Sequence, residues 1–448
     1  MRVQAEAAFD PGLRGLPAGS GVVVIGGGVV GVSAALSLVE AGVPVLLCEK
    51  GRIAAEQSSR NWGWVRKQGR DIRELPLMIE AQALWRRHAG GLGPEIGYRE
   101  AGCTYLCASE VELEAHAKWL DAARGHQLGS RLWSRRDLAA RIGAGAAGFV
   151  GALHTPDDAM AEPGLAVPAL ARRAAALGAE IREATAVRAL IRSGGRVSGV
   201  MTEHGPVTCD AVILAGGAWS RTFMENLGLA LPQLAIRASV MRSSAGPEID
   251  LGPRGTGAIG AAGASVRRRM DGGYTIARSG AARFEIIPAG FRHFTAFLPM
   301  LRRRWRIIEL GLGRSFFGPL GRQRWDETGP SPFEAVRILD PVPDMRLLAD
   351  VMATAQRLHP ALRDVRPVQS WGGMIDVTPD ELPVIDHVPQ APGLVLATGF
   401  SGHGFGIGPG AGLAAAQLAT GVAPVVALSA FALDRFGRRL GRRVARAA

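Results

Sequence analysis

Residues 21–50 read GVVVIGGGVVGVSAALSLVEAGVPVLLCEK, and this stretch decides the fold of the chain. Residues 22–25 and 43–48 are apolar runs rich in β-branched side chains, which suit strands buried on both faces. Between them, Ala34, Leu36 and Leu38 lie in a segment of helical length. The stretch therefore predicts a strand, a glycine turn, a helix and a second strand.

The glycine turn predicts a dinucleotide site. Gly26, Gly28 and Gly31 have the G-x-G-x-x-G spacing, in which the first glycine permits the turn, the second admits a pyrophosphate and the third lets helix and strand pack closely. The pyrophosphate would meet free N–H groups at the positive end of the helix. Glu49 ends the second strand, where an acid accepts a hydrogen bond from the adenosine ribose. That acid disfavours NADP but does not choose between NAD and FAD, and a glycine-rich turn in an ordinary βαβ unit is the alternative.

Composition indicates a folded protein of two domains. The chain has 448 residues, of which 47% are hydrophobic and 21% charged, so it is too long for one simple core and has no long disordered tract. The net charge of +12 comes almost entirely from arginine, since the lysines are Lys50, Lys67 and Lys118. A GC-rich coding sequence gives the same bias and no nucleic-acid module is recognisable, so we expect no nucleic-acid partner. Attraction to an acidic substrate, partner or membrane surface stays open.

The remaining compositional features indicate a cytoplasmic protein without a metal site. Its four cysteines are scattered and lie outside any His or Cys cluster, so we expect reduced core residues. Residues 1–18 lack a signal-peptide hydrophobic core and are expected to form an N-terminal extension. Residues 408–431 are apolar, but polar residues and a proline interrupt them, so we expect a buried helix and a following segment, and no transmembrane segment.

Later segments return to the nucleotide turn. Residues 210–220, DAVILAGGAWS, are a strand that runs into glycines, and residues 394–412 repeat the pattern of strand, glycine turn and helix. Residues 230–364 show no clear βα order. The expected organisation is a discontinuous nucleotide domain over 19–97, 155–229 and 365–448, and a second domain over 98–154 and 230–364.

Six stretches together carry a family resemblance. They are VVVIGGGVVG with Glu49, DDAMAEPGLAVPALARRAAALGA, DAVILAGGAWS, DGGYTIA at 271–277, TPDELPVID at 378–386 and LATGFSGHGFGIGPGAG at 396–412. In this order they resemble the FAD-dependent family of D-amino acid oxidases and dehydrogenases, glycine oxidase and sarcosine oxidase. The resemblance implies an α/β and α+β fold: a Rossmann-type FAD-binding domain with an inserted, largely antiparallel-sheet substrate domain.

The same resemblance implies the chemistry and the cofactor contacts. A hydride would pass from the carbon beside an amine to flavin N5, leaving an imine that water hydrolyses, while the N-terminus of the helix after Gly399–Gly408 stabilises the reduced ring. The expected cofactor-binding residues are Gly26, Gly28, Gly31, Glu49, Lys50, Ser58, Ser59, Arg60, Asn61, Trp62, Gly63, Val187, Ala215, Gly216, Trp219, Gly373, Gly399, Gly402, His403, Gly404, Phe405 and Gly406.

Two departures from the family pattern are informative. Sarcosine oxidase-like members carry a substrate-binding lysine two residues after the G-H-G of the last turn, and here that position is Gly406. Those members also attach flavin through a cysteine just before the T-P-D segment, where this chain has Gly373 and Met374. We therefore expect noncovalent FAD.

Four residues are candidates for the reacting end of the site. Matching GWVR at 63–66 to the family's loop places Arg66 on its carboxylate-binding arginine, a bidentate role that arginine fills best. Tyr274 and Arg278 lie on the expected flavin-facing sheet, although Tyr274 is as consistent with a core residue. His403 is consistent both with a flavin contact and with shaping its loop.

The leading hypothesis is an FAD-dependent amino acid or amine oxidoreductase that oxidises the C–N bond of a D-amino acid or an N-substituted amino acid. The absence of any lysine after Lys118 favours a dehydrogenase that uses a quinone or another acceptor over an oxidase that uses oxygen, although Arg278 could supply the positive charge instead. The alternatives are oxidation of a 2-hydroxy acid, a flavin subunit of a multi-chain electron-transfer complex, and a nonenzymatic FAD-binding scaffold. Peripheral contact with a membrane stays open, and the sequence does not decide side chain, chirality or oligomeric state.

Overall fold

The first sheet is built around the predicted βαβ unit. The computed structural model describes residues 9, 15–249, 251, 255–305, 308–321 and 324–437, so the expected extension at 1–18 and the end of the chain lie largely outside the described residues. β1 (Gly19–Ile25) pairs in parallel with β2 (Val45–Cys48) on one side and with β12 (Gly205–Leu214) on the other. Its apolar residues Val22, Val23 and Val24 are at most 3% exposed, as expected for a strand covered on both faces.

In the described ranges this sheet has eight strands, in the order β10-β11-β12-β1-β2-β9, with β21 beside β12 and β20 beside β21. β10 and β11 form an antiparallel extension of β12, and β20 is an antiparallel edge strand, whereas β2, β9 and β21 run parallel to their inner neighbours. The strands not yet bounded are β9 (Glu180–Arg182), β10 (Val187–Ser193), β11 (Arg196–Thr202), β20 (Val384–His387) and β21 (Leu394–Thr398).

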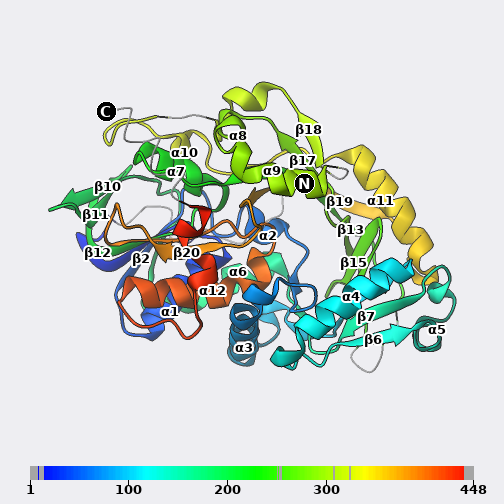
Figure 1. Ribbon diagram of the computed structural model, residues 1–448. Helices are drawn as coiled ribbons and strands as arrows, with labels where there is room; N and C mark the ends of the chain where they lie inside the picture. The colour runs from blue at the N-terminus through cyan, green and yellow to red at the C-terminus, as the bar shows by residue number, and fades with distance from the viewer. Residues whose placement is uncertain are drawn as a thin grey trace.

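A second sheet lies beside the first (Figure 1). Its strand β13 (Leu234–Ser243) has three partners, because it pairs antiparallel with β16, β17 and β19. Ten strands of the described chain belong to this sheet, and all its pairs are antiparallel except β14 with β5 and β17 with β18. The other strands are β5 (Cys103–Cys107), β6 (Arg131–Ser134), β7 (Gly151–Thr155), β14 (Ala258–Ala261), β15 (Ala264–Arg268), β16 (Tyr274–Ala277), β17 (Ala282–Glu285), β18 (Ile308–Gly311) and β19 (Pro367–Val377).

Three short strands form a third, small sheet. β8 (Ala159–Met160) pairs with β3 (Trp64–Val65) and with β4 (Arg99–Glu100). The α-helices are α1 (Val29–Glu40), α2 (Gln57–Arg60), α3 (Leu75–Leu92), α4 (Glu110–Ala122), α5 (Arg135–Ile142), α6 (Pro163–Ala176), α7 (Ser220–Asn226), α8 (Pro288–Arg292), α9 (Phe294–Arg304), α10 (Pro332–Ala335), α11 (Met345–Leu358) and α12 (Gly404–Ala419).

Helix α12 packs against α1 and α3 (Figure 1). Its glycines permit the close approach: a Cβ on Gly412 would lie 2.6 Å from the backbone nitrogen of Ala34, and one on Gly410 would lie 2.8 Å from the carbonyl oxygen of Leu77. This is the buried helix predicted from the apolar run after residue 408. Across the described part of the chain, no helix has the length and apolar character needed to cross a membrane.

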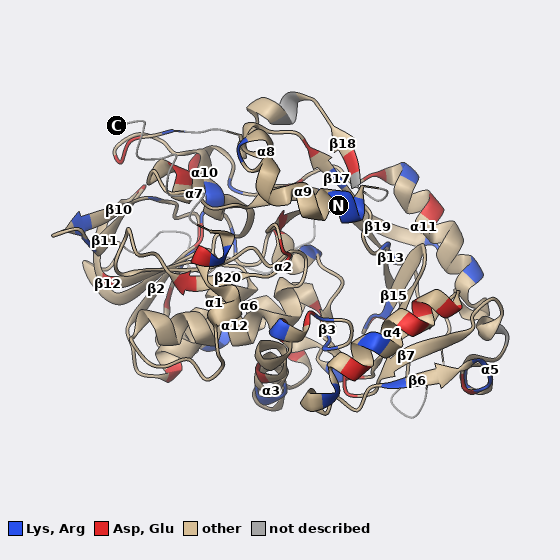
Figure 2. Ribbon diagram, in the orientation of Figure 1, with Lys and Arg blue, Asp and Glu red and all other residues tan. Residues whose placement is uncertain are grey.

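Sheet membership differs from the expected organisation at one segment. β19 lies within 365–448, which we expected to belong to the nucleotide domain, yet it pairs along its length with β13 of the second sheet. The domain boundaries themselves stay a prediction. Helix α4 carries four acidic residues and one lysine, Lys118 (Figure 2). The charge of that helix is therefore mainly acidic.

Candidate functional site

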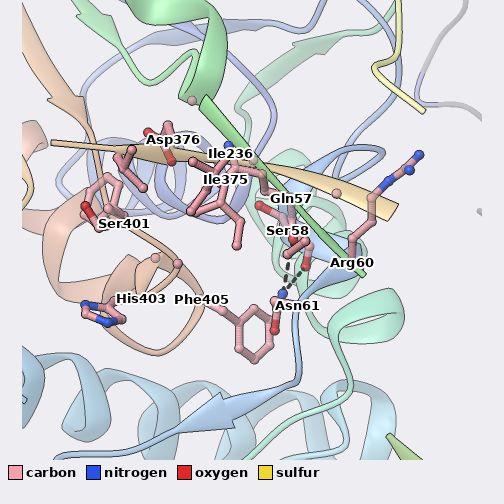
Figure 3. A pocket seen from close by; sticks show the side chains of 18 of the residues that line it. Gln57, Ser58, Arg60, Asn61, Ile236, Ile375, Asp376, Ser401, His403 and Phe405 are labelled. Carbon is pink, nitrogen blue, oxygen red and sulfur yellow. Dashed lines mark hydrogen bonds between the residues drawn. The ribbon is translucent and has the colours of Figure 1, made fainter. Parts of the chain in front are cut away.

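One cavity of about 1170 Å³ joins the two sheets. Ile25, Leu214 and Ala397 line it at the carboxyl ends of β1, β12 and β21, which is where ligands bind to open α/β sheets. Ile236 of β13 and Ile375 of β19 line it from the second sheet (Figure 3). Its volume exceeds the roughly 300–1000 Å³ that is usual for a small-molecule site. The cavity therefore has room for a large ligand.

The predicted glycine turn forms one wall. Gly26 has a φ of 111°, a conformation that favours glycine, and a Cβ there would lie 2.5 Å from the carbonyl oxygen of Ala215. A Cβ on Gly31 would lie 1.9 Å from the carbonyl oxygen of Gly26, so this position holds helix and turn in contact. A Cβ on Gly28 would have only the Ser58 hydroxyl oxygen as a near neighbour, at 3.1 Å. Gly28 therefore leaves open space on the side that faces the cavity. It is the N-cap residue of α1 and makes no side-chain hydrogen bond to the helix.

Glu49 closes the turn from β2. Its two carboxylate oxygens accept hydrogen bonds from the backbone N–H groups of Gly27 and Gly51, each at 2.7 Å. Burial raises the pKa of this carboxyl to about 7, although Lys50 and the two N–H donors act in the opposite direction. An acid that lines the cavity at the end of β2, beside the N-terminus of α1, fits the ribose and pyrophosphate of a dinucleotide.

The segment around α2 and residue 219 forms the adjoining wall. The Ser58 hydroxyl accepts a hydrogen bond from the backbone N–H of Val29 at 2.9 Å, and the Asn61 side chain donates to the Ser58 carbonyl at 2.8 Å (Figure 3). Lys50 pairs with Glu56 at 2.7 Å, and its ammonium lies 4.4 Å from the centre of the Trp219 ring. Lys50 is therefore held at the nucleotide end of the cavity.

The turn before α12 forms another wall, and a buried carboxylate fixes its shape. Asp376 is 2% exposed and accepts hydrogen bonds from the Gly399 backbone at 2.7 Å and the Gln233 side chain at 3.0 Å. Burial raises the pKa of Asp376, and the Gly399 N–H is the largest opposing influence. The sequence analysis missed Asp376 and Gln233, because nothing in their local pattern separates them from ordinary strand and loop residues.

The cavity brings together most of the expected cofactor residues. Those that line it are Gly26, Gly28, Glu49, Lys50, Ser58, Arg60, Asn61, Trp62, Val187, Ala215, Gly216, Trp219, Gly373, Gly402, His403, Gly404 and Phe405. Those that lie behind the lining are Gly31, Ser59, Gly63, Gly399 and Gly406. Among the expected catalytic residues, Arg66, Arg278 and His403 line the cavity, whereas Tyr274 is fully buried in the second sheet's core and donates to the Pro247 carbonyl.

Arg66 and Arg70 place two guanidinium groups in the cavity wall. Arg66 lies 5.6 Å from the ring centre of Trp64 and 5.5 Å from that of Tyr105, and it donates to the Gln68 carbonyl. Arg70 is 4% exposed, and its Nη1 has no hydrogen-bond partner in the described structure. Burial, and next the charge of Arg66, lower the pKa of Arg70 to about 10. Both remain charged at neutral pH.

A carboxylate and an imidazole lie beside these arginines. Glu74 is 1% exposed, and neither of its oxygens has a hydrogen-bond partner among the described residues. The Nδ1 atom of His403, the residue before α12, lies 3.6 Å from Glu74 Oε2. Our sequence analysis missed Glu74 because it precedes α3 in a stretch that predicts only the start of a helix. Its position, four residues after Arg70 in a charged loop, is the one available signal.

Comparison with known proteins agrees with this geometry. A family model described as FAD dependent oxidoreductase matches residues 21–418. The chain belongs to this family. The predicted FAD cofactor and the predicted oxidoreductase are thereby confirmed, and the mixed α/β fold is confirmed by the solved structures of relatives.

Relatives named for amino acid or amine oxidation cover most of the chain. Glycine oxidase from Pseudomonas aeruginosa is 26% identical over 421 residues, covering 90% of this chain and 96% of the relative. The structure of L-amino acid deaminase from Proteus myxofaciens, solved with anthranilate, is 31% identical with a TM-score of 0.89, covering 96% of this chain and 97% of that one. 4-Methylaminobutanoate oxidase (formaldehyde-forming) from Paenarthrobacter nicotinovorans is 29% identical over 429 residues, but the chain spans only 46% of its length. These names agree with the predicted oxidation of amino acids or amines.

Proposed function

We propose that the chain oxidises the C–N bond of an amino acid, with an L-amino acid as the first substrate to test. The observation that carries this proposal is that one cavity is lined both by the nucleotide turn and by the guanidinium groups of Arg66 and Arg70. A carboxylate-bearing substrate is what a pair of buried arginines fits best. The L configuration is placed first because the Proteus relative that shares 31% identity is named for L-amino acids.

The second sheet is assigned as the substrate domain in this proposal. β13 and β19 contribute Ile236, Ala238 and Ile375 to the cavity wall that faces the nucleotide turn. Trp62 and Trp64 line the same cavity, and their rings meet edge to face with centres 5.3 Å apart. Apolar walls of this kind exclude water from the reacting carbon and hold the substrate in a fixed orientation.

The residues present fit FAD, which when bound supplies the acceptor for a hydride from the substrate carbon. Backbone N–H groups at the start of α1 would hold its pyrophosphate, and Glu49 would accept from its ribose hydroxyls. Arg66 and Arg70 would bind the substrate carboxylate and so fix the α-carbon in the cavity. The N-terminus of α12 offers a positive dipole end to negative charge in the cavity, and water hydrolyses the released imine.

Anaerobic mixing tests the proposal. The purified holoprotein is mixed with L-amino acids, D-amino acids, N-methyl amino acids and 2-hydroxy acids while the visible flavin band is followed. Loss of the band with one class of amine supports the proposal, whereas loss with hydroxy acids alone, or with none of them, refutes it. Arg66→Met should raise KM for an amino acid by about tenfold or more, as expected for loss of a charge-assisted hydrogen bond. The same change at exposed Arg131 is the matched control.

We further propose that the electrons pass to an acceptor other than oxygen. Lys50 is the only lysine that lines the cavity within the described ranges, and its pairing with Glu56 holds it at the nucleotide end. A mobile ammonium group is therefore missing from the substrate end, where it would favour the reduction of oxygen. Slow return of the flavin band in air, with rapid return on adding a soluble quinone, supports this assignment; equal rates contradict it.

A further inference from the structure

Glu74 is a buried charge whose partners do not account for it. A carboxylate that is 1% exposed ordinarily accepts several hydrogen bonds, because burying an unpaired charge is costly. In the described structure neither oxygen of Glu74 accepts one, although the residue lines the cavity. Two explanations follow. Either a group of the bound ligand donates the hydrogen bond that Glu74 lacks, or Glu74 acts on a neighbouring residue that itself gains a charge.

That neighbour is His403. Its Nδ1 lies 3.6 Å from Glu74 Oε2 and also lacks a hydrogen-bond partner, which leaves Nε2 for the cavity that the ring lines. The imidazole is held by the turn before α12, since the His403 backbone donates to the Phe400 carbonyl at 2.8 Å. Figure 3 shows His403 in the segment that runs from Ser401 into the start of α12, at the side of the pocket opposite Asn61. Glu74 and His403 thus form a fixed pair at the cavity wall.

The charges around this pair favour a neutral imidazole beside an ionised carboxylate. Burial and the charges of Arg70 and Arg66 lower the pKa of His403, and Glu74 opposes them. For Glu74, burial acts to raise the pKa, but His403 and Arg70 outweigh it, so the value lies below the ordinary one. Asp71 is the other acidic group that acts on the pair. A neutral imidazole next to an anion can accept a proton.

We propose that His403 accepts the proton that the substrate ammonium must lose, and that Glu74 orients the ring and stabilises the imidazolium. This inference rests on the proposed function, because only a neutral amine has the lone pair that assists departure of a hydride from its carbon. One N–H bond of the ammonium breaks, its electron pair stays on the amine nitrogen, and the proton forms an N–H bond at His403 Nε2. The Nδ1–H then faces Glu74, and the proton passes to water after the product leaves.

Another histidine of the cavity lacks this arrangement. His116 on α4 lines the cavity, but among the described residues no carboxylate oxygen lies within 4.0 Å of its ring nitrogens. Its neighbour along the helix, Glu112, accepts from the backbone of Ala108 at 2.7 Å. His116→Gln is therefore a matched control for removing a titratable ring from the cavity.

The test is the pH dependence of kcat/KM for the amino acid that the wild type oxidises fastest. Wild-type kcat/KM should fall on the acid side as His403 becomes protonated, below the ordinary histidine value of about 6.5. His403→Gln should lose about 10²-fold or more at neutral pH and recover as rising pH deprotonates the substrate itself. Glu74→Gln should shift the acid limb to lower pH, because its carboxylate raises the pKa of His403. His116→Gln should keep the wild-type profile.

A binding measurement separates failure of this inference from failure of the proposed function. An α-methyl amino acid has no hydrogen to give up but keeps its ammonium, whereas the matching desamino acid has only the carboxylate. Glu74→Gln should weaken binding of the α-methyl amino acid by about tenfold and leave the affinity for the desamino acid unchanged. Titration calorimetry on the holoprotein measures both affinities. His403→Asn repeats the kinetic test if the glutamine variant does not fold. An unchanged acid limb in both His403 variants, or equal weakening of both ligands, overturns the inference even where amines are oxidised.

Discussion

Replacing Gly31 with alanine tests whether the glycine turn is shaped by packing. The new Cβ would lie 1.9 Å from the carbonyl oxygen of Gly26 and 3.1 Å from its carbonyl carbon, and 3.3 Å from a Val24 methyl group. Two of the three contacts are backbone atoms, so α1 itself must move away from β1. Overpacking in a core costs about 1–3 kcal/mol, and a contact this short belongs at the upper end of that range. We expect the free energy of unfolding of the apoprotein to fall by about 3 kcal/mol.

Gly28→Ala is the informative comparison within the same turn. Gly28 has a φ of −74°, so alanine brings no backbone strain, and its Cβ would meet only the Ser58 hydroxyl oxygen at 3.1 Å. The apoprotein should keep its stability, while the methyl group fills the place of the pyrophosphate and weakens FAD binding by about tenfold or more, or ~1.4 kcal/mol. Gly90→Ala in α3, where a Cβ meets no atom within 4 Å, should stabilise by about 0.5–1 kcal/mol.

Urea unfolding of the apoproteins and fluorescence titration with FAD measure the two effects separately. An apoprotein of Gly31→Ala as stable as the wild type would refute the packing argument. Loss of stability in Gly28→Ala with unchanged FAD affinity would refute the assignment of Gly28 to the pyrophosphate.

Three further changes test other parts of the structure. Tyr274→Phe removes the hydrogen bond to the Pro247 carbonyl in the core and should lower stability by about 1 kcal/mol while kcat stays at the wild-type value, as urea unfolding and steady-state assays show. Arg267→Met removes two of the hydrogen bonds that Glu162 accepts, at 2.9 and 3.1 Å, and leaves it the Met270 backbone N–H at 3.0 Å and the Arg269 guanidinium at 3.7 Å. The change should therefore cost about 3 kcal/mol, at the lower end for a broken buried pair. Glu162→Gln in the same chain should restore much of that stability, and no recovery contradicts the ion-pair explanation. For Glu49, a folded pKa of about 7 lies above the unfolded value, so the stability it contributes to the apoprotein is complete below about pH 4.5 and lost as the pH rises through 7. Glu49→Gln should reduce this pH-dependent loss of folding stability by on the order of 3 kcal/mol. A variant whose pH–stability curve runs parallel to that of the wild type would contradict the raised pKa of Glu49.

The nucleotide turn was predictable because its chemistry is local. The strand, the three glycines and the acid at residue 49 are close in sequence, and each has a backbone requirement that few residue types meet. Residues 394–398 and 404–419 were likewise predictable as strand and helix, since apolar runs next to glycines show both the element and its end.

The second sheet was less predictable because its pairing is remote in sequence. β13 pairs with β19, with Leu234 opposite Val377 and Ser243 opposite Pro367. Because these two strands lie far apart in the sequence, no hairpin turn joins them, and no turn motif reveals their pairing. β13 is mixed in its burial, with partly buried residues at its centre where the cavity wall lies, and its apolar alternation is weak. Tyr274 shows the consequence: the strand was identified, but the face on which its side chain lies depends on partners that local sequence does not specify.

One structural feature, the strand β3, bears both on the missing lysine and on the position of Arg66. At Gly406, where sarcosine oxidase-like members have their lysine, a Cβ would lie 2.9 Å from the Trp64 carbonyl oxygen and 3.2 Å from the Val65 Cα. β3 therefore occupies the space that a side chain would need, and the indole of Trp85 donates to the Gly406 carbonyl at 2.9 Å to hold the helix there. The chain that leaves β3 continues directly into Arg66. The strand that leaves no room for a side chain at Gly406 therefore also places Arg66 at the cavity, where the proposed function assigns it to the substrate carboxylate.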